Sequence, residues 1–88
     1  MAMDKITTME RLSDKVSCTY GAVVKFGDRL FVTDVHWKGG FTACIYEFID
    51  DPEETGLSDI ECRVSLIAEA EQRFEDGGNA IAWCLKQK

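Results

Sequence analysis

The spacing of hydrophobic residues near the N-terminus predicts a short helix. Thr7-Thr8-Met9-Glu10 has the pattern of a capping box, in which a Thr oxygen and a Glu three residues later satisfy free helix N–H groups. Met9, Leu12 and Val16 then recur at helical spacing, so the helix is expected to end near Val16. A helix this short is marginal on its own and must pack against the rest of the chain.

Residues 18–49 have the composition and turn signals of a three-stranded antiparallel meander. Gly27-Asp28 and Gly39-Gly40 are the expected two-residue turns, which gives strands over 18–26, 29–38 and 41–49. Pairing the strands through these turns predicts one face that is rich in large hydrophobic residues and forms the core. That face contains Cys18, Tyr20, Ala22, Val24, Phe26, Phe31, Val35, Trp37, Cys44, Tyr46 and Phe48.

The opposite face of the predicted meander is mixed. It contains Thr19, Val23, Lys25, Leu30, Val32, Asp34, His36, Lys38, Phe41, Ala43, Ile45, Glu47 and Ile49. These include too many large apolar residues for a solvated surface, so either the N-terminal helix or a second chain is expected to cover the face. The second alternative makes Leu30, Val32 and Ile45 an oligomer interface, most simply that of a homodimer.

The last third of the chain predicts a helix followed by a strand. Ser58-Asp59-Ile60-Glu61 is a second capping box, and it is expected to open a helix that runs to about Glu75 and ends at Gly77-Gly78. After the glycines, large and small residues alternate, which predicts a fourth strand, with a short amphipathic helix as the alternative. The chain is therefore predicted to be a single α+β domain over residues 1–88, with element order α-β-β-β-α-β. Its antiparallel sheet of three or four strands would pack against the helices.

Composition supports a globular domain and argues against a membrane protein. The 88 residues are 45% hydrophobic and 30% charged, with one proline. There is no apolar run of the roughly 18 residues that span a membrane, and Met1–Lys5 lacks the apolar stretch of a signal peptide. We therefore expect a cytoplasmic protein, in the host cytoplasm if a phage encodes it. The four cysteines form no C-x-x-C pair, so they are expected to be reduced thiols.

Negative charge is concentrated in the second half of the chain. Residues 1–46 hold five acids and six bases, whereas residues 47–88 hold eleven acids and four bases, a net charge of −7. One stretch without any base contains Asp50, Asp51, Glu53, Glu54, Asp59 and Glu61, and these are the candidate partner-binding residues. Such a field attracts basic partners and repels nucleic acid, so no direct nucleic-acid binding is expected.

The sequence contains no recognised catalytic or metal-binding motif. An EF-hand loop counted from Asp51 would need Glu at position 12, where this chain has Cys62. A Cys–His nucleophile pair would need His36 on the side of Cys44, and the predicted register places them on opposite faces. We therefore expect no catalytic residue, no metal and no cofactor, and a protein that is not an enzyme.

These features predict a non-catalytic protein-interaction module with an acidic binding surface. The sharper hypothesis is an inhibitor that covers the basic, nucleic-acid-binding surface of a partner protein, as anti-defence proteins of phages and mobile elements do. One alternative is a homo-oligomeric structural or adaptor domain that associates through the mixed sheet face. A small metal-binding protein or enzyme is the remaining alternative.

Overall fold

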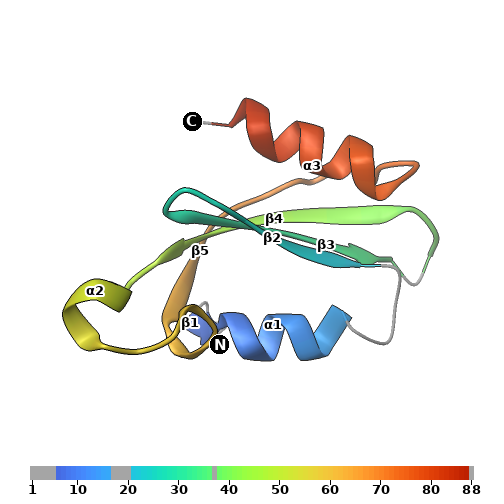
Figure 1. Ribbon diagram of the computed structural model, residues 1–88. Coiled ribbons are helices and arrows are strands. Elements are labelled where there is room, and N and C mark those ends of the chain that lie inside the picture. The colour runs from blue at the N-terminus through green and yellow to red at the C-terminus, as the bar shows by residue number, and fades with distance from the viewer. Residues whose placement is uncertain (1–5, 17–20, 37, 88) are drawn as a thin grey trace, which may run out of the picture.

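The computed structural model describes residues 6–16, 21–36 and 38–87, which form an antiparallel sheet with helices on both faces (Figure 1). In chain order the elements are β1 (Ile6–Thr8), α1 (Met9–Val16), β2 (Ala22–Phe26), β3 (Arg29–Val35), β4 (Phe41–Phe48), α2 (Pro52–Thr55), the 3-10 turn η1 (Asp59–Glu61), β5 (Arg63–Glu69) and α3 (Gly77–Lys86). The strands lie in the order β1-β5-β4-β3-β2, and each neighbouring pair is antiparallel. The predicted α+β class is confirmed, with five strands in the sheet. No helix in the described part of the chain is long and apolar enough to cross a membrane.

Helix α1 covers one face of the sheet. Leu12 and Val16 lie one turn apart and project from the same side of the helix, where both are buried. The cluster that they join on the sheet consists of Leu30, Val32 and Val64. The predicted helix is therefore confirmed, although its first turn is capped by Thr8 rather than Thr7: Arg11 N–H donates to Thr8 Oγ1 over 3.2 Å.

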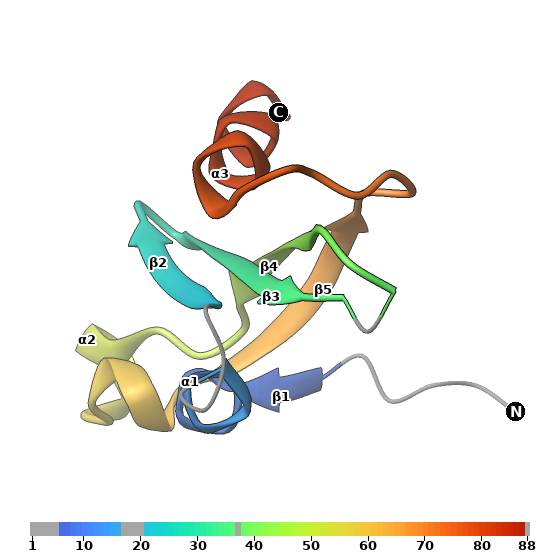
Figure 2. The same ribbon diagram turned by 90° about the vertical axis from the view of Figure 1, so that its right-hand side faces the viewer.

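Helix α3 covers the opposite face, so the sheet lies between two helices (Figure 2). Ala80 and Cys84 are fully buried on this face, four positions apart along the helix. They pack against Phe31, Ala43 and Ile45 of the two central strands. Because successive side chains of a strand point to opposite faces, β3 supplies Leu30 and Val32 to the α1 side and Phe31 to the α3 side.

The predicted pairing of the first hairpin is correct. Gly27 and Asp28 form the turn between β2 and β3, and Gly27 has the positive φ of 64° that favours glycine. Val24 lies opposite Phe31, and Lys25 lies opposite Leu30. Cys18, Thr19, Tyr20 and Trp37, which the sequence placed on the two faces, lie outside the described residues.

The predicted register of the second hairpin is wrong. Strand β3 ends at Val35, which pairs with Phe41, so the connecting loop has five residues (36–40) instead of two. Gly39 and Gly40 both have positive φ, and His36 N–H donates to Gly40 O over 2.8 Å across the loop. The strand partner of Phe41 thus moves by three positions, from residue 38 to residue 35. Because side chains alternate, this odd shift turns every residue of β4 to the opposite face.

This shift also removes the predicted shared oligomer face. Leu30 and Val32 lie under α1 with Cys44 and Tyr46, whereas Ile45 lies under α3 with Phe31. Leu30 and Ile45 are 0% exposed and Val32 is 6% exposed. The three residues therefore do not form one surface, because helices of the same chain cover each of them.

The helix predicted from Ser58 to Glu75 is wrong. Only the 3-10 turn η1 forms at its start, and residues 63–69 form β5, which pairs with both β4 and β1. Val64 and Ile67 are compatible with helical spacing, but Val64 and Leu66 also alternate with polar residues, and pairing beside β4 favours the strand. Tertiary pairing has overridden a local helix signal.

The strand predicted after Gly78 is also wrong, and the alternative of a short helix is confirmed. Asp76 precedes helix α3, and its carboxylate accepts a hydrogen bond from Asn79 N–H over 2.7 Å. An Asp at this position is a strong helix start signal. Gly77 and Gly78 therefore lie in the first turn of α3 and do not terminate an earlier helix.

Candidate functional site

The acidic segment, residues 50–61, connects the end of β4 to the start of β5. It lies beside the turn between β2 and β3, because Gly27 and Asp28 line the same cleft as Asp51 and Glu53. Phe48 N–H donates to Asp28 O over 3.2 Å, which ties the end of β4 to that turn. Two segments that are more than 20 residues apart in sequence thereby lie side by side.

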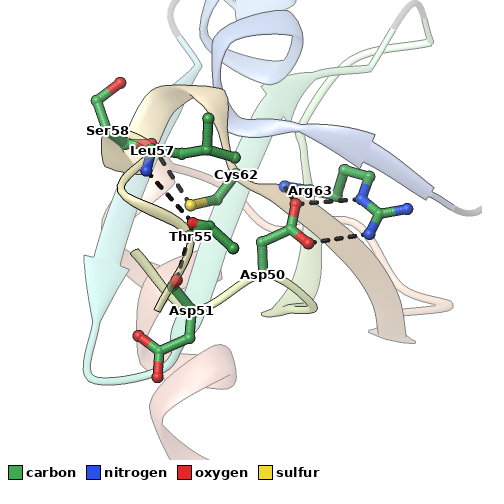
Figure 3. A network of polar contacts seen from close by, with 7 residues as sticks. All are labelled: Asp50, Asp51, Thr55, Leu57, Ser58, Cys62 and Arg63. Carbon is green, nitrogen blue, oxygen red and sulfur yellow. Dashed lines mark hydrogen bonds and ion pairs between the residues drawn. The ribbon is translucent and has the colours of Figure 1, made fainter. Parts of the chain in front are cut away.

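Asp50 is neutralised within the protein. Its two carboxylate oxygens accept hydrogen bonds from Arg63 Nε (3.1 Å) and Arg63 Nη2 (2.9 Å), and Arg63 backbone N–H adds a third bond (3.0 Å). These bonds hold the pKa of Asp50 below its ordinary value. Figure 3 shows the Asp50–Arg63 pair, which joins the start of the acidic segment to the first residue of β5. Asp50 thus fixes the segment on β5 and contributes little free negative charge.

Asp51 directly precedes the single-turn helix α2 and caps it. Its Oδ1 accepts from Glu53 N–H over 2.9 Å, and its carbonyl oxygen accepts from Thr55 N–H, also over 2.9 Å. The Asp51 carboxylate points away from the Asp50–Arg63 pair (Figure 3). The side chain therefore shapes the turn and still presents its charge to solvent.

Glu53 and Glu54 are exposed on α2. Among the residues that the structure describes, no base forms an ion pair with either of them. The carboxylates of Glu53 and Glu54 are therefore the uncompensated part of the acidic segment.

Glu61 has a local structural role. Its Oε1 accepts from Ser58 Oγ (2.7 Å) and Ser58 N–H (3.3 Å), and these bonds lower the pKa of Glu61. Only half of the predicted box forms: Glu61 accepts from Ser58 N–H, but Glu61 N–H donates to the Ser58 carbonyl and not to its hydroxyl, and the contact closes one 3-10 turn. The side chain of Asp59 lies outside the described residues.

A cleft of about 500 Å³ separates the acidic segment from the β2–β3 turn. Its walls carry the carboxylates of Asp28, Asp51 and Glu53 and the ring of Phe48. Lys25 Nζ lies 5.5 Å from the centroid of the Phe48 ring, so the chain itself places one cation in this cleft. An aromatic face surrounded by carboxylates suits a Lys or Arg side chain.

Lys25, Asp28 and Phe48 line the cleft but were not predicted as site residues. Phe48 was assigned to the core, and Lys25 and Asp28 lie more than 20 residues before the acidic segment. Pairing of β3 with β4 brings these residues together, and no local sequence signal indicates it.

The chain matches the model of the nucleotide modification associated domain 4 family (Nmad4) over residues 3–88. It belongs to this family. No curated protein and no solved structure matches the chain.

Two of the described thiols of this Nmad4 domain, Cys44 and Cys84, are poor nucleophiles. Burial raises the pKa of Cys44 to about 12, and Glu69 adds to the shift because Cys44 Sγ donates to Glu69 Oε2 over 3.5 Å. Burial also raises the pKa of Cys84 to about 11. Both are free thiols and stay protonated at neutral pH, whereas the thiolate is the reactive form. Within the described residues, no three His, Cys, Asp or Glu side chains are grouped to hold a metal ion.

Proposed function

We propose that this Nmad4 domain is a non-catalytic interaction module whose acidic cleft binds a basic surface of a partner protein. The observation that carries the proposal is the exposed acidic turn α2: Glu53 and Glu54 form no ion pair with a base among the described residues, and Asp51 and Glu53 line the same cleft as Phe48. Like charges held this close repel one another, and a partner that supplies Lys or Arg side chains relieves the repulsion.

The partner surface is proposed to be one that binds nucleic acid. Proteins contact phosphates with clustered Lys and Arg side chains, and carboxylates on a rigid scaffold can occupy the same cations. The family is described as a nucleotide modification associated domain, which names no partner, and we take a nucleic-acid-modifying enzyme as the partner to test first. Bound in this way, the domain competes with nucleic acid and inhibits the enzyme.

The test compares two triple variants that remove the same number of negative charges. The first is Asp51→Asn/Glu53→Gln/Glu54→Gln, in which Asn can still accept the α2 capping bond. The control is Glu10→Gln/Glu71→Gln/Glu75→Gln, which neutralises three exposed acids outside the acidic segment. The immobilised proteins are incubated with lysate of the source cell, and captured proteins are eluted in steps of rising salt.

We expect wild type and the control to capture the same basic protein, with elution at similar salt. The first variant should capture it at least 10-fold less, since rim and cleft charges set association rate and salt dependence. Duplex DNA added as competitor should release the partner. Equal capture by both variants, or a captured partner that DNA does not displace, would contradict the proposal.

A further inference from the structure

Strand β2 ends the described sheet, and one of its faces is exposed. Helix α3 packs on Phe31 of β3 and on Ala43 and Ile45 of β4, and the side chains of β2 that share this face are exposed. Val24 is 38% exposed and Phe26 is 59% exposed, and Leu85 of α3, which lines a hollow with Phe26, is 52% exposed. A strand edge with apolar side chains is a template for pairing with another strand.

The exposed ring of Phe26 is held in place. It stacks on Phe31 with 5.7 Å between ring centroids and 19° between planes. A hollow of about 270 Å³ lies beside it, lined by Phe26, Arg29, Phe31, Leu85 and Gln87 among others. Arg29 Nη1 donates to Gln87 O over 3.2 Å, which joins the C-terminal end of α3 to β3 at this position. The surface is therefore preformed.

We propose that a second copy of this chain pairs with β2 in antiparallel orientation, about a two-fold axis at Val24. In this register Val24 lies opposite the partner's Val24, and Ala22 lies opposite the partner's Phe26. The α3-side face then places a small residue against a large one at each end and Val against Val at the centre. In a two-fold interface the same strand supplies both sides, and Ala22–Phe26 offers a small side chain at one end for the large side chain at the other.

The distribution of charge favours the same arrangement. Lys25 is the only charged residue of β2, and it lies opposite the partner's Val23 rather than another charge. A lysine on an edge strand commonly opposes pairing, but Lys25 Nζ lies near the Phe48 ring of its own chain. Each acidic segment adjoins the Gly27-Asp28 turn, and antiparallel pairing puts the two turns at opposite ends of the interface. A parallel pair would bring the two acidic ends together.

Single cysteine variants test the register. In Val24→Cys the two new thiols lie directly across the axis, with Cβ atoms about 5 Å apart, so mild oxidation should link two chains. In Phe26→Cys the equivalent thiols are four residues apart along the strands, roughly 14 Å, which is too far for a disulfide. Wild type treated with the same oxidant measures the contribution of the native cysteines.

A charge substitution tests association itself. Val24→Glu should place a charge in the interface and weaken dimerisation about 100-fold in sedimentation velocity. Ile67→Glu is the matched control, because Ile67 is 46% exposed and lies on β5, away from this edge. Circular dichroism checks that both variants fold. The proposal is overturned by a monomeric wild type at all concentrations, or by cross-linking of Phe26→Cys that equals that of Val24→Cys.

Discussion

At the scale of single residues, the neighbours of each acid in the acidic segment decide its role. Asp50 is bound by Arg63 and Glu61 by Ser58, so both are structural. Glu53 and Glu54 have exposed carboxylates, and the Asp51 side chain both caps α2 and faces solvent. The sequence shows that acids are concentrated here, but it does not show which carboxylates are satisfied, because Arg63 lies beyond the segment and approaches only when β5 pairs with β4.

Replacing Asp50 should change the pH dependence of stability. The folded protein holds the pKa of Asp50 below its ordinary value of 3.8, so the ionised form favours folding. This contribution is complete above the ordinary pKa and is lost as the pH falls through the lowered folded pKa. Asp50→Asn cannot form the ion pair, so its melting temperature should be lower than that of wild type at neutral pH, and the difference should close in acid.

The measurement is thermal unfolding followed by circular dichroism at a series of pH values. In an Arg63→Met background the Asp50→Asn substitution should lose most of its effect, because the partner is already absent. A gap between wild type and Asp50→Asn that stays constant with pH would show that the ion pair does not stabilise the fold.

At the scale of elements, the hairpin β2–β3 and helix α1 could be predicted because local signals decide them. Gly27-Asp28 specifies a tight turn, and Leu12 with Val16 specifies the buried side of α1. The second hairpin could not be predicted in the same way. Gly39-Gly40 indicated a turn, but the loop begins at His36, and this shift reversed the faces of Cys44 and Ile45.

The last third of the chain shows that non-local contacts can outweigh local pattern. The spacing of Val64 and Ile67 fits a helix as well as a strand. The segment is a strand because it pairs with β4 and with β1, and no sequence pattern predicted β1. For α3 a local signal did exist, since Asp76 caps the helix through Asn79 N–H. The two glycines that follow Asp76 suggested a helix end instead and obscured that signal.

Helix α1 and strand β3 approach closely at Gly21, and a methyl group there should destabilise the fold. A Cβ at this position would lie 2.4 Å from Thr33 O and 2.9 Å from Val16 Cβ. Gly21→Ala therefore has to separate α1 from β3, and we expect a loss of about 1–3 kcal/mol of unfolding free energy. Urea denaturation measures it.

The matched control for Gly21→Ala is Gly77→Ala. Its Cβ would approach Thr33 Oγ1 no closer than 3.9 Å, and Gly77 is helical, so Ala should be neutral or stabilise by roughly 0.5–1 kcal/mol. Similar effects of the two substitutions would mean that the approach of α1 to β3 is not tight.

At the scale of the whole molecule, the dominant feature is the net charge of −6 and its uneven distribution. Asp50 forms an ion pair with Arg63, whereas Glu53 and Glu54 are exposed and form no ion pair with a base among the described residues. Self-repulsion of this kind destabilises a compact state. The concentration of exposed acids in the second half therefore lowers the stability of the fold unless salt or an opposite charge screens them.

This cost predicts that added sodium chloride stabilises the fold. Screening lengths fall to about 10 Å at 0.1 M salt, so repulsion among the acids should weaken and the melting temperature should rise. For a domain of this size, each 1 kcal/mol corresponds to roughly 4–8 °C. The variant Asp51→Asn/Glu53→Gln/Glu54→Gln should melt higher than wild type at low salt and respond less to added salt. A melting temperature that falls with salt would show that attractive pairs dominate the surface. If the variant melts higher than wild type and also no longer captures the basic partner, then the same three carboxylates lower stability and make binding possible. Binding would then explain why the chain retains side chains that destabilise it.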